Sequence, residues 1–334
     1  MLANAVMKAA VLESYAEPFK YTEISRPIAK QGEVLVRIKA SGVNPLDIKI
    51  QAGKADHART KLPAVLGIDL AGVVESVGAS VESFHVGDEV YGMTGGIGGI
   101  QGSLAEFAAV DADLLALKPQ NLMMREAAAL PLIFITAWEG LVDKANTREG
   151  QKVLIQGGSG GVGHIAVQLA RALGASVFAT GSASNKRIIE GFGATAIDYR
   201  TMTVEQYVAA HTDGLGFDVI YDTAGGATLD ASFAAAKYYE GHVISILGWG
   251  KHSLAPLSFR AATYSGVFTL LPLLTGKGRA HHGEILREAT KLIEAGKLKP
   301  NLDSRRFNLQ TVQDAYEVIE SCQARGKIIV DITE

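Results

Sequence analysis

The pattern of apolar and polar positions changes near Pro131 and divides the chain into two regions. Before that point, short runs alternate between apolar and polar residues, as half-buried antiparallel strands do. The runs are Lys8–Leu12, Glu33–Ala40, Leu70–Val77 and Glu89–Tyr91, and they are punctuated by Gly72, Gly78, Gly87 and Gly92. We therefore predict a small β-barrel-like domain in this region.

After Pro131, continuous apolar runs alternate with helical segments. Such runs are typical of strands that are buried on both faces of a parallel sheet. The predicted strands begin at Lys152 and lie at Ser176–Thr180, Phe217–Asp222 and Gly241–Leu247, and the predicted helices are His164–Leu173, Leu229–Ala236 and Glu284–Ala295. This order predicts an α/β domain with a doubly wound parallel sheet.

The last run, Gly326–Ile332, has the pattern of one more strand. A doubly wound sheet that already has six strands offers it no place, so we expect it to return to the first domain. The predicted organisation is a first domain of residues 1–130, joined by residues 275–334, and a nucleotide-binding domain of residues 131–274.

The composition is that of an ordinary globular protein, since 48% of the 334 residues are hydrophobic and 20% are charged. A formal net charge of -3, without a polybasic stretch, argues against nucleic acid and membrane as partners. Residues 1–6 precede the first strand without a secretory pattern, and we expect a ragged or alternative start and a cytoplasmic protein. Cys322 is the only cysteine, which excludes disulfides within the chain and a cysteine-rich metal site.

Glycines with the spacing G-x-G-x-x-G lie between a buried strand and a helix, at Gly158, Gly160 and Gly163. Glycines there permit a tight turn, let the backbone approach a pyrophosphate, and let the helix pack closely on the strand. The start of the helix offers N–H groups and the positive end of its dipole to a phosphate. The cofactor-binding residues predicted in this loop are Gly158, Ser159, Gly160, Gly161 and Val162.

Six short motifs follow one another along the chain in the order of a known family. They are Ala40–Asp47, Leu66–Val74, Val86–Tyr91, Gly102–Phe107, Leu130–Pro131 with Thr136–Trp138, and Gly326–Val330. With them the chain resembles the medium-chain dehydrogenase/reductase superfamily, and within it the zinc-independent branch of quinone oxidoreductases and enone reductases. The resemblance implies a GroES-like β-barrel domain, a Rossmann domain, a C-terminal segment that returns to the first domain, and a homodimer.

The same resemblance bears on metal binding. Zinc-binding members of the superfamily place a cysteine where this chain has Asn44 and a His-Glu pair where it has Ile68-Asp69. An amide and an isoleucine do not replace a thiolate and an imidazole, so we predict no metal site and interpret Asp69 as a structural hydrogen-bonding residue. His281 and His282 are expected to be a solvated pair in a loop.

Three side chains in the matched motifs are candidates for the catalytic site. Asn44 either donates its amide N–H to a substrate oxygen or the nicotinamide ribose, or satisfies backbone groups beside Pro45. Lys49 stands where many quinone oxidoreductases carry a tyrosine and alkenal reductases often show lysine. It either binds a carbonyl oxygen or a phosphate, or is a solvated surface lysine. Thr136 matches a threonine that contacts the nicotinamide region, with a helix cap or a core hydroxyl as the alternative.

The second strand of the Rossmann domain bears on the choice of cofactor. NAD enzymes place an acidic residue at its end, and the segment after Ala179 has none. Ser182 and Lys186 are suited to bind a 2′-phosphate, and by the resemblance Tyr199 joins them; the alternative is a serine-rich turn with solvated cations. We therefore predict NADPH as the cofactor.

The end of a later strand supplies the last candidates. Leu247, Gly248 and Trp249 follow this strand at its carboxyl end, where open α/β sheets bind ligands. We assign all three to cofactor binding. Trp249 either forms a wall of the substrate pocket or is an ordinary packing residue.

These observations predict hydride transfer without a metal. Reduction of an unconjugated carbonyl ordinarily requires a Lewis acid or a strong proton donor, whereas a conjugated enone or a quinone needs only hydrogen bonds to the developing enolate. We predict an NADPH-dependent oxidoreductase that reduces a small-molecule quinone or α,β-unsaturated carbonyl. Two alternatives stay open: an enoyl-thioester reductase of the same superfamily, and an NADPH-binding sensor or structural protein with little turnover.

Overall fold

The computed structural model describes residues 5–333, which divide into two compact units. The first unit extends to Leu132 and also contains Leu270–Glu294 and the chain from Pro300 onward. The second unit contains Ile133–Thr269 and Ala295–Lys299. Residues 1–4 of the predicted ragged start lie outside the described residues, and the first strand begins at Val6.

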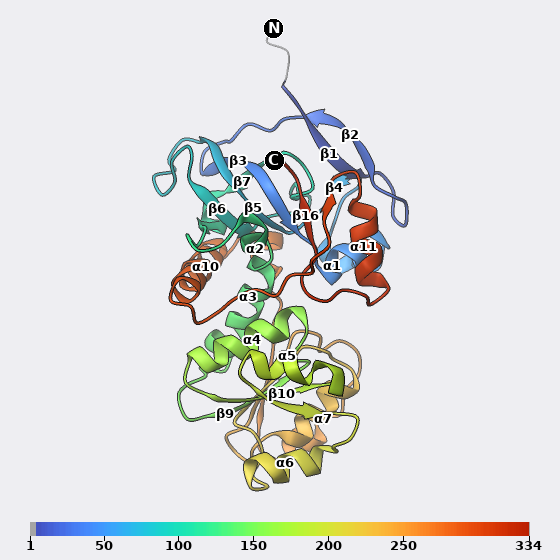
Figure 1. Ribbon diagram of the computed structural model, residues 1–334, viewed down its shortest axis with the longest axis vertical. Helices are drawn as coiled ribbons and strands as arrows, with labels where there is room; N and C mark the ends of the chain where they lie inside the picture. Colours follow the sequence, from blue (N-terminus) through green and yellow to red (C-terminus); the bar gives the residue numbers. More distant parts are fainter. Residues whose placement is uncertain (1–4, 334) are drawn as a thin grey trace. The chain divides into compact units, whose positions relative to one another are not determined.

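Two sheets form the first unit (Figure 1). Their strands are β1 (Val6–Leu12), β2 (Lys20–Ser25), β3 (Glu33–Gly42), β4 (Ala64–Val65), β5 (Asp69–Val77), β6 (Glu89–Met93), β7 (Phe107–Asp111), β8 (Leu115–Leu117), β15 (Phe307–Asn308) and β16 (Ile329–Asp331). The smaller sheet has the order β2-β1-β4, and the larger has the order β15-β16-β3-β5-β6-β8, with β7 also paired to β3. All pairs except β15 with β16 are antiparallel, as expected for a GroES-like domain.

The C-terminal strand β16 returns to this unit. It pairs with β3, so that Val330 lies opposite Ser41. Figure 1 shows it, in red, among the strands from the first third of the chain. The predicted return of the C-terminal segment is therefore confirmed.

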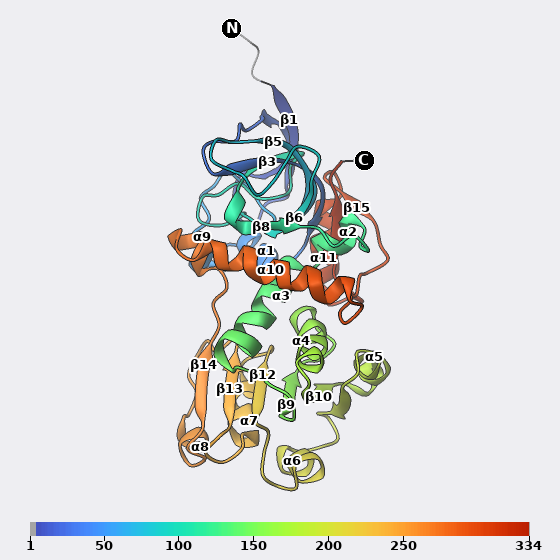
Figure 2. The same ribbon diagram turned by 90° about the vertical axis from the view of Figure 1, so that its left-hand side faces the viewer.

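Helices cover parts of the first unit. They are α1 (Pro45–Gln51), α2 (Met124–Ala128), α9 (Leu271–Thr275), α10 (Arg279–Glu294) and α11 (Val312–Glu320). Helix α10 packs against β8 and β6 (Figure 2). It begins at Arg279, so His281 and His282 lie in a helix, His282 is fully buried, and the predicted solvated loop pair is wrong.

Six parallel strands form the sheet of the second unit. Figure 2 labels β14, β13, β12, β9 and β10 along it. They are β9 (Lys152–Gln156), β10 (Ser176–Gly181), β11 (Thr195–Asp198), β12 (Val219–Asp222), β13 (His242–Ser245) and β14 (Thr263–Gly266). Their order is β11-β10-β9-β12-β13-β14, which confirms the predicted doubly wound sheet. The edge strands β11 and β14 were not predicted.

The helices of the second unit include α4 (Gly161–Ala172), α5 (Lys186–Gly191), α6 (Val204–Thr212), α7 (Ala227–Ala235) and α8 (Ala255–Ser258). Helix α3 (Pro131–Trp138) carries the chain from the first unit into the second. Leu154, Phe217, Ile220 and Phe233 belong to the apolar core between the sheet and its helices. Within residues 5–333, no helix combines the length and the apolar run that crossing a bilayer requires.

Candidate functional site

A glycine-rich turn joins β9 to α4. Gly157 has a φ of 78°, which favours glycine, and its carbonyl accepts a hydrogen bond from Gly160 N at 3.0 Å. A Cβ on Gly163 would lie 2.0 Å from the Gly157 oxygen, so only glycine lets α4 start this close to the turn. Gly160 is the N-cap of α4, and the first N–H groups of the helix, from Gly161 and Val162, have no acceptor within it. This is the form of a phosphate-binding turn.

A cavity of about 730 Å³ lies beside this turn, at the carboxyl ends of β9 and β10. Three of the predicted cofactor-binding residues line it: Ser159 in the turn, Ser182 after β10, and Tyr199 after β11. Apolar and small residues form much of the remaining wall, namely Met202, Val204, Tyr207, Ala224, Ala227 and Ala231. Polar residues share it, among them Thr203, Thr228 and one carboxylate, that of Glu205. Open parallel sheets bind their ligands at this edge.

The turn after β10 carries no carboxylate, since residues 176–189 contain neither Asp nor Glu. Ser182 Oγ lies 2.9 Å from Ser184 Oγ. The Lys186 ammonium pairs with Glu190 at 3.8 Å, and its side chain is 66% exposed. The structure thus places Ser182 on the cavity wall and Lys186 one turn away from it, outside the lining.

Two polar residues near this turn were not predicted. Asn185 lines the cavity, and the Arg200 guanidinium lies 5.8 Å from the centre of the Tyr199 ring. Arg200 is therefore a cation next to Tyr199, although it does not itself line the cavity. Its position directly after Tyr199 in the sequence could have indicated it.

A buried carboxylate holds the base of the loop that carries Leu247, Gly248 and Trp249. Asp222, at the end of β12, accepts a hydrogen bond from Ser245 Oγ at 2.7 Å and others from the backbone of its own turn. Ser245 Oγ in turn accepts from Leu247 N at 3.1 Å. The Trp249 side chain beyond this point is exposed. Neither Asp222 nor Ser245 was singled out, although each ends a buried apolar run.

Thr136 lies in α3 and is buried. Its hydroxyl is 3.2 Å from that of Thr269, which also donates to Glu139 Oε2 at 2.7 Å. Tyr221 OH donates to the Thr136 carbonyl at 2.6 Å. The pKa of this phenol is raised mainly by burial and, to a lesser degree, by the negative charge of Glu139. The Thr136 hydroxyl therefore belongs to a hydrogen-bonded group that ends on a carboxylate.

In the first unit, Asn44 is fully buried before α1, and its amide is held at both ends. Lys327 Nζ donates to Asn44 Oδ1 and to the Val43 carbonyl, while Asn44 Nδ2 donates to Asp69 Oδ2 at 2.9 Å. An ammonium only donates and a carboxylate only accepts, so these partners fix the orientation of the amide. The other oxygen of Asp69 accepts from Leu132 N, which agrees with its predicted structural role.

Asn44, Asp47, Asp69 and Lys327 form what we call the buried charge cluster. Asp47 Oδ2 accepts a hydrogen bond from Asn44 N at 2.8 Å. Burial raises the pKa of Asp47 to about 7 and that of Asp69 to about 6. Burial also lowers the pKa of Lys327, against the attraction of both carboxylates. The cluster therefore holds carboxylates that exchange protons near neutral pH.

The remaining predicted side chain, Lys49, is exposed on α1. Burial is the main cause that lowers the pKa of His57, and the positive charge of Lys49 is the second. Asn44, in contrast, exposes no surface, so its contact with a substrate oxygen stays a prediction. The structure groups Asn44 with the buried charge cluster and leaves Lys49 outside it.

The positions that hold zinc in zinc-binding relatives carry Asn44 and the fully buried Ile68. Across residues 5–333, no three His, Cys, Asp or Glu side chains are grouped to hold a metal ion. That the protein works without a metal stays a prediction, which chelation tests.

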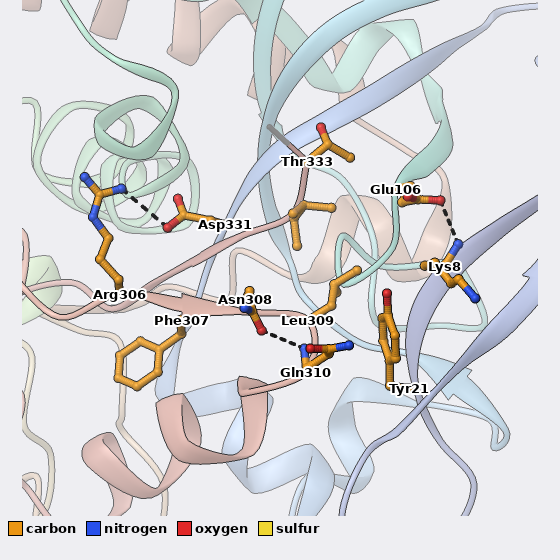
Figure 3. Close-up of a pocket in the computed structure, with 11 residues that line it drawn as sticks. Lys8, Tyr21, Glu106, Arg306, Phe307, Asn308, Leu309, Gln310, Asp331 and Thr333 are labelled. Atoms are coloured by element: carbon orange, nitrogen blue, oxygen red, sulfur yellow. Dashed lines mark hydrogen bonds and ion pairs between the residues drawn. The ribbon is translucent and has the colours of Figure 1, made fainter.

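A second cavity, of about 620 Å³, lies in the first unit beside the C-terminal strand (Figure 3). Its charged groups have partners within the unit: Arg306 pairs with Asp331 at 3.4 Å, and Glu106 accepts from Lys8 N at 2.7 Å. None of the residues predicted for the functional site lines this cavity. We assign the functional site to the cavity beside the glycine turn instead.

Comparison with known families gives two matches. The family described as alcohol dehydrogenase GroES-like domain matches residues 30–120, and the family described as zinc-binding dehydrogenase matches residues 192–330. The first match covers most strands of the first unit. The second extends from the end of α5 to β16.

Three curated relatives are similar over most of the chain. A 2-methylene-furan-3-one reductase from Solanum lycopersicum is 36% identical, covering 92% of this chain and 74% of the relative. An NADPH-dependent alkenal/one oxidoreductase from Arabidopsis thaliana is 35% identical, with 91% and 73% covered. A chloroplast envelope quinone oxidoreductase homolog from the same plant is 33% identical, with 99% and 100% covered.

Solved structures share the whole architecture. An alcohol dehydrogenase superfamily protein from Novosphingobium aromaticivorans is 56% identical, with a TM-score of 0.96 over 98% of this chain and 100% of that one. The CurK enoyl reductase is 26% identical, with a TM-score of 0.85 over 98% and 99%.

Proposed function

Because the chain belongs to the medium-chain dehydrogenase/reductase superfamily, in the branch of quinone oxidoreductases and enone reductases, we propose that it reduces quinones or α,β-unsaturated carbonyls with NADPH. The observation that carries the proposal is the glycine turn before α4 with the cavity beside it. The names of the tomato and Arabidopsis relatives support a conjugated carbonyl or a quinone as the substrate.

The residues around this cavity fit a dinucleotide. The N–H groups of Gly161 and Val162 face a pyrophosphate with the positive end of α4, and no side chain intervenes at Gly160. Ser182 and Tyr199 on the cavity wall would hold the 2′-phosphate, and the exposed Lys186 ammonium would supply a positive charge to it in place of its pair with Glu190. The absence of an acidic side chain in residues 176–189 supports NADPH over NADH.

The nicotinamide supplies the hydride, and the protein supplies position and electrostatics. We assign to Lys49, which is exposed on α1, the stabilisation of the enolate oxygen that develops in the reaction. Asn44 presents a rigid amide, because Lys327 and Asp69 hold both of its ends, and its second Nδ2 hydrogen is the proposed donor. Thr136 orients the nicotinamide through its hydroxyl.

A screen of NADPH oxidation tests this proposal. Purified protein is assayed with quinones, short enones, alkenals and enoyl thioesters, each with and without a chelator. We expect turnover with quinones or enones and no effect of the chelator. Faster turnover of enoyl thioesters would favour the second candidate, an enoyl-thioester reductase, which the likeness to the CurK enzyme supports. NADPH binding without turnover of any class would favour a sensor.

The protein is also proposed to be a homodimer. Strand β14 forms one edge of the six-stranded sheet among the described residues. Thr263 N donates to the Gly241 carbonyl just before β13, and Val267 N donates to the Ser245 carbonyl at its end. The N–H groups of Tyr264 and Gly266 therefore point away from β13 and are available to a second copy. Exposed aromatic side chains flank this edge at Phe259 and Phe268.

A further inference from the structure

His252 lies in the loop after β13 and uses both nitrogens of its ring. One meets helix α7, and the other meets the backbone of the loop itself. Nδ1 lies 2.8 Å from Asp230 Oδ1, and Nε2 lies 3.3 Å from the Trp249 carbonyl oxygen. A carboxylate and a backbone carbonyl accept hydrogen bonds and donate none. Both ring nitrogens must therefore carry hydrogen for both bonds to form, and only the imidazolium satisfies this. A neutral ring keeps the shorter bond, to Asp230, and gives up the bond to the Trp249 carbonyl.

The groups around His252 favour its charged form. The hydrogen bond that the ring donates to Asp230 on α7 is the largest cause that raises the pKa of His252, and the charge of Asp222 at the end of β12 acts in the same direction. Phe233 packs edge-on against the imidazole, with ring centres 6.4 Å apart, and also contacts Tyr264 of β14. Lys251 precedes His252 in the loop and is exposed.

The loop that His252 holds has no helix or strand between Ile246 and Leu254. Its base is fixed by the bond of Leu247 N to Ser245 Oγ, and a tight turn brings Trp249 N to the Leu247 carbonyl at 2.8 Å. Gly250 follows with a φ of 109°, which favours glycine and sends the chain back toward α7. His252 therefore holds the far side of the turn that carries the Trp249 side chain.

We propose that His252 and Asp230 are positioning residues that set the place of Trp249 in the wall of the substrate pocket, and so determine which quinones or enones fit. This inference rests on the proposed function and on the interpretation of Trp249 as a wall of the substrate pocket, one of the two interpretations that the sequence allows. The bonds from the Trp249 carbonyl through the His252 ring to Asp230 on α7 are complete only while the ring carries both hydrogens, because the neutral ring keeps the bond to Asp230 alone. Loss of one hydrogen releases the Trp249 carbonyl and lets the indole move.

The first test needs no substrate. The chain has two tryptophans, so Trp138→Phe leaves Trp249 as the only indole. In this background we expect acrylamide quenching of Trp249 to increase as the pH rises through the raised pKa of His252. Adding His252→Ala should give the high-pH quenching at every pH. His281→Ala is the matched control, because His281 makes a similar ion pair with Glu284 at 3.1 Å on α10. Identical pH profiles with and without His252 would overturn the proposal.

The second test measures steady-state kinetics of His252→Ala and Asp230→Asn against the wild type. We expect KM for a bulky enone to rise by about threefold to tenfold, which corresponds to the loss of one hydrogen bond. For the wild type we expect KM to rise with pH, and His252→Ala should remove this rise. Equal KM values in wild type and variants would overturn the role in substrate fit. A wild type that turns over no quinone or enone contradicts the proposed function alone, because the fluorescence test still reports on the His252 link.

Discussion

Two glycines in the turn before α4 have different roles: Gly163 allows close packing, and Gly160 leaves space for the pyrophosphate. Substitutions distinguish these roles. A Cβ at Gly163 would lie 2.0 Å from a backbone oxygen, whereas one at Gly160 would lie 3.3 Å from it. We expect Gly163→Ala to lower the free energy of unfolding by about 1–3 kcal/mol, as overpacking does. Gly160→Val should retain most stability and weaken NADPH binding by at least about tenfold, since its side chain occupies the approach of the pyrophosphate. Thermal unfolding and NADPH titration check both, and unchanged affinity in folded Gly160→Val would contradict the assignment of the turn.

We also expect the choice of cofactor to depend on single residues. Removing a cation that binds the 2′-phosphate affects NADPH and not NADH, so Lys186→Ala should weaken NADPH binding by about tenfold and leave NADH binding unchanged. The loss should shrink at high ionic strength, because the ammonium is largely exposed. Arg187→Ala, one position along the same helix, is the control and should have little effect. Equal weakening of both cofactors would show that the phosphate site is elsewhere.

At the scale of elements, the buried charge cluster joins the start of α1, the start of β5 and the segment before β16. Its two carboxylates have pKa values raised to about 7 and about 6, so the folded protein holds protons between about pH 4 and pH 7 that the unfolded chain releases. Stability contributed by these carboxylates therefore falls as the pH rises through this window.

Asp47→Asn tests this dependence. The variant removes one titrating carboxylate, so the drop in unfolding free energy from pH 5 to pH 8 should shrink by about 1–3 kcal/mol. Asp303→Asn is the control, because hydrogen bonding to Arg305 lowers the pKa of Asp303 and places its titration below this range. Denaturant unfolding at both pH values measures the difference. The same drop in wild type and Asp47→Asn would show that Asp47 stays ionised in the folded state.

Elements with a strong local pattern were predictable, and those set by distant contacts were not. The turn from β9 to α4 has its glycines, apolar strand and helix within one short segment. Strand β14, in contrast, is mostly polar and partly exposed at the sheet edge, so no apolar run marks it. Lys327 meets Asn44 across 283 positions, and His252 meets Asp230 through loop geometry, so no spacing in the sequence indicates either pair.

For the whole molecule, the open edge of β14 leads to a prediction about assembly. Gly266→Pro removes an N–H that points away from β13, and a Cβ at this position has room, since its nearest neighbour would be 3.9 Å away. We expect the wild type to be a dimer and this variant a monomer in light scattering, each with an intact circular dichroism spectrum. A wild type that is monomeric at micromolar concentration would contradict the proposed homodimer.

The place of β16 between β15 and β3 has a consequence for the order in which the protein matures on the ribosome. Strand β3 emerges early in synthesis, yet its neighbour and the Lys327 ammonium arrive only with the last residues of the chain. The parallel sheet of the second unit is encoded without such an interruption, between β9 and β14. The second unit, although synthesised later, is therefore able to fold first. Until the last residues emerge, the first unit has an incomplete sheet edge, and Asp47 and Asp69 lack the Lys327 ammonium. A nascent chain stalled before residue 326 should resist protease in its nucleotide-binding half and be cleaved in its N-terminal half.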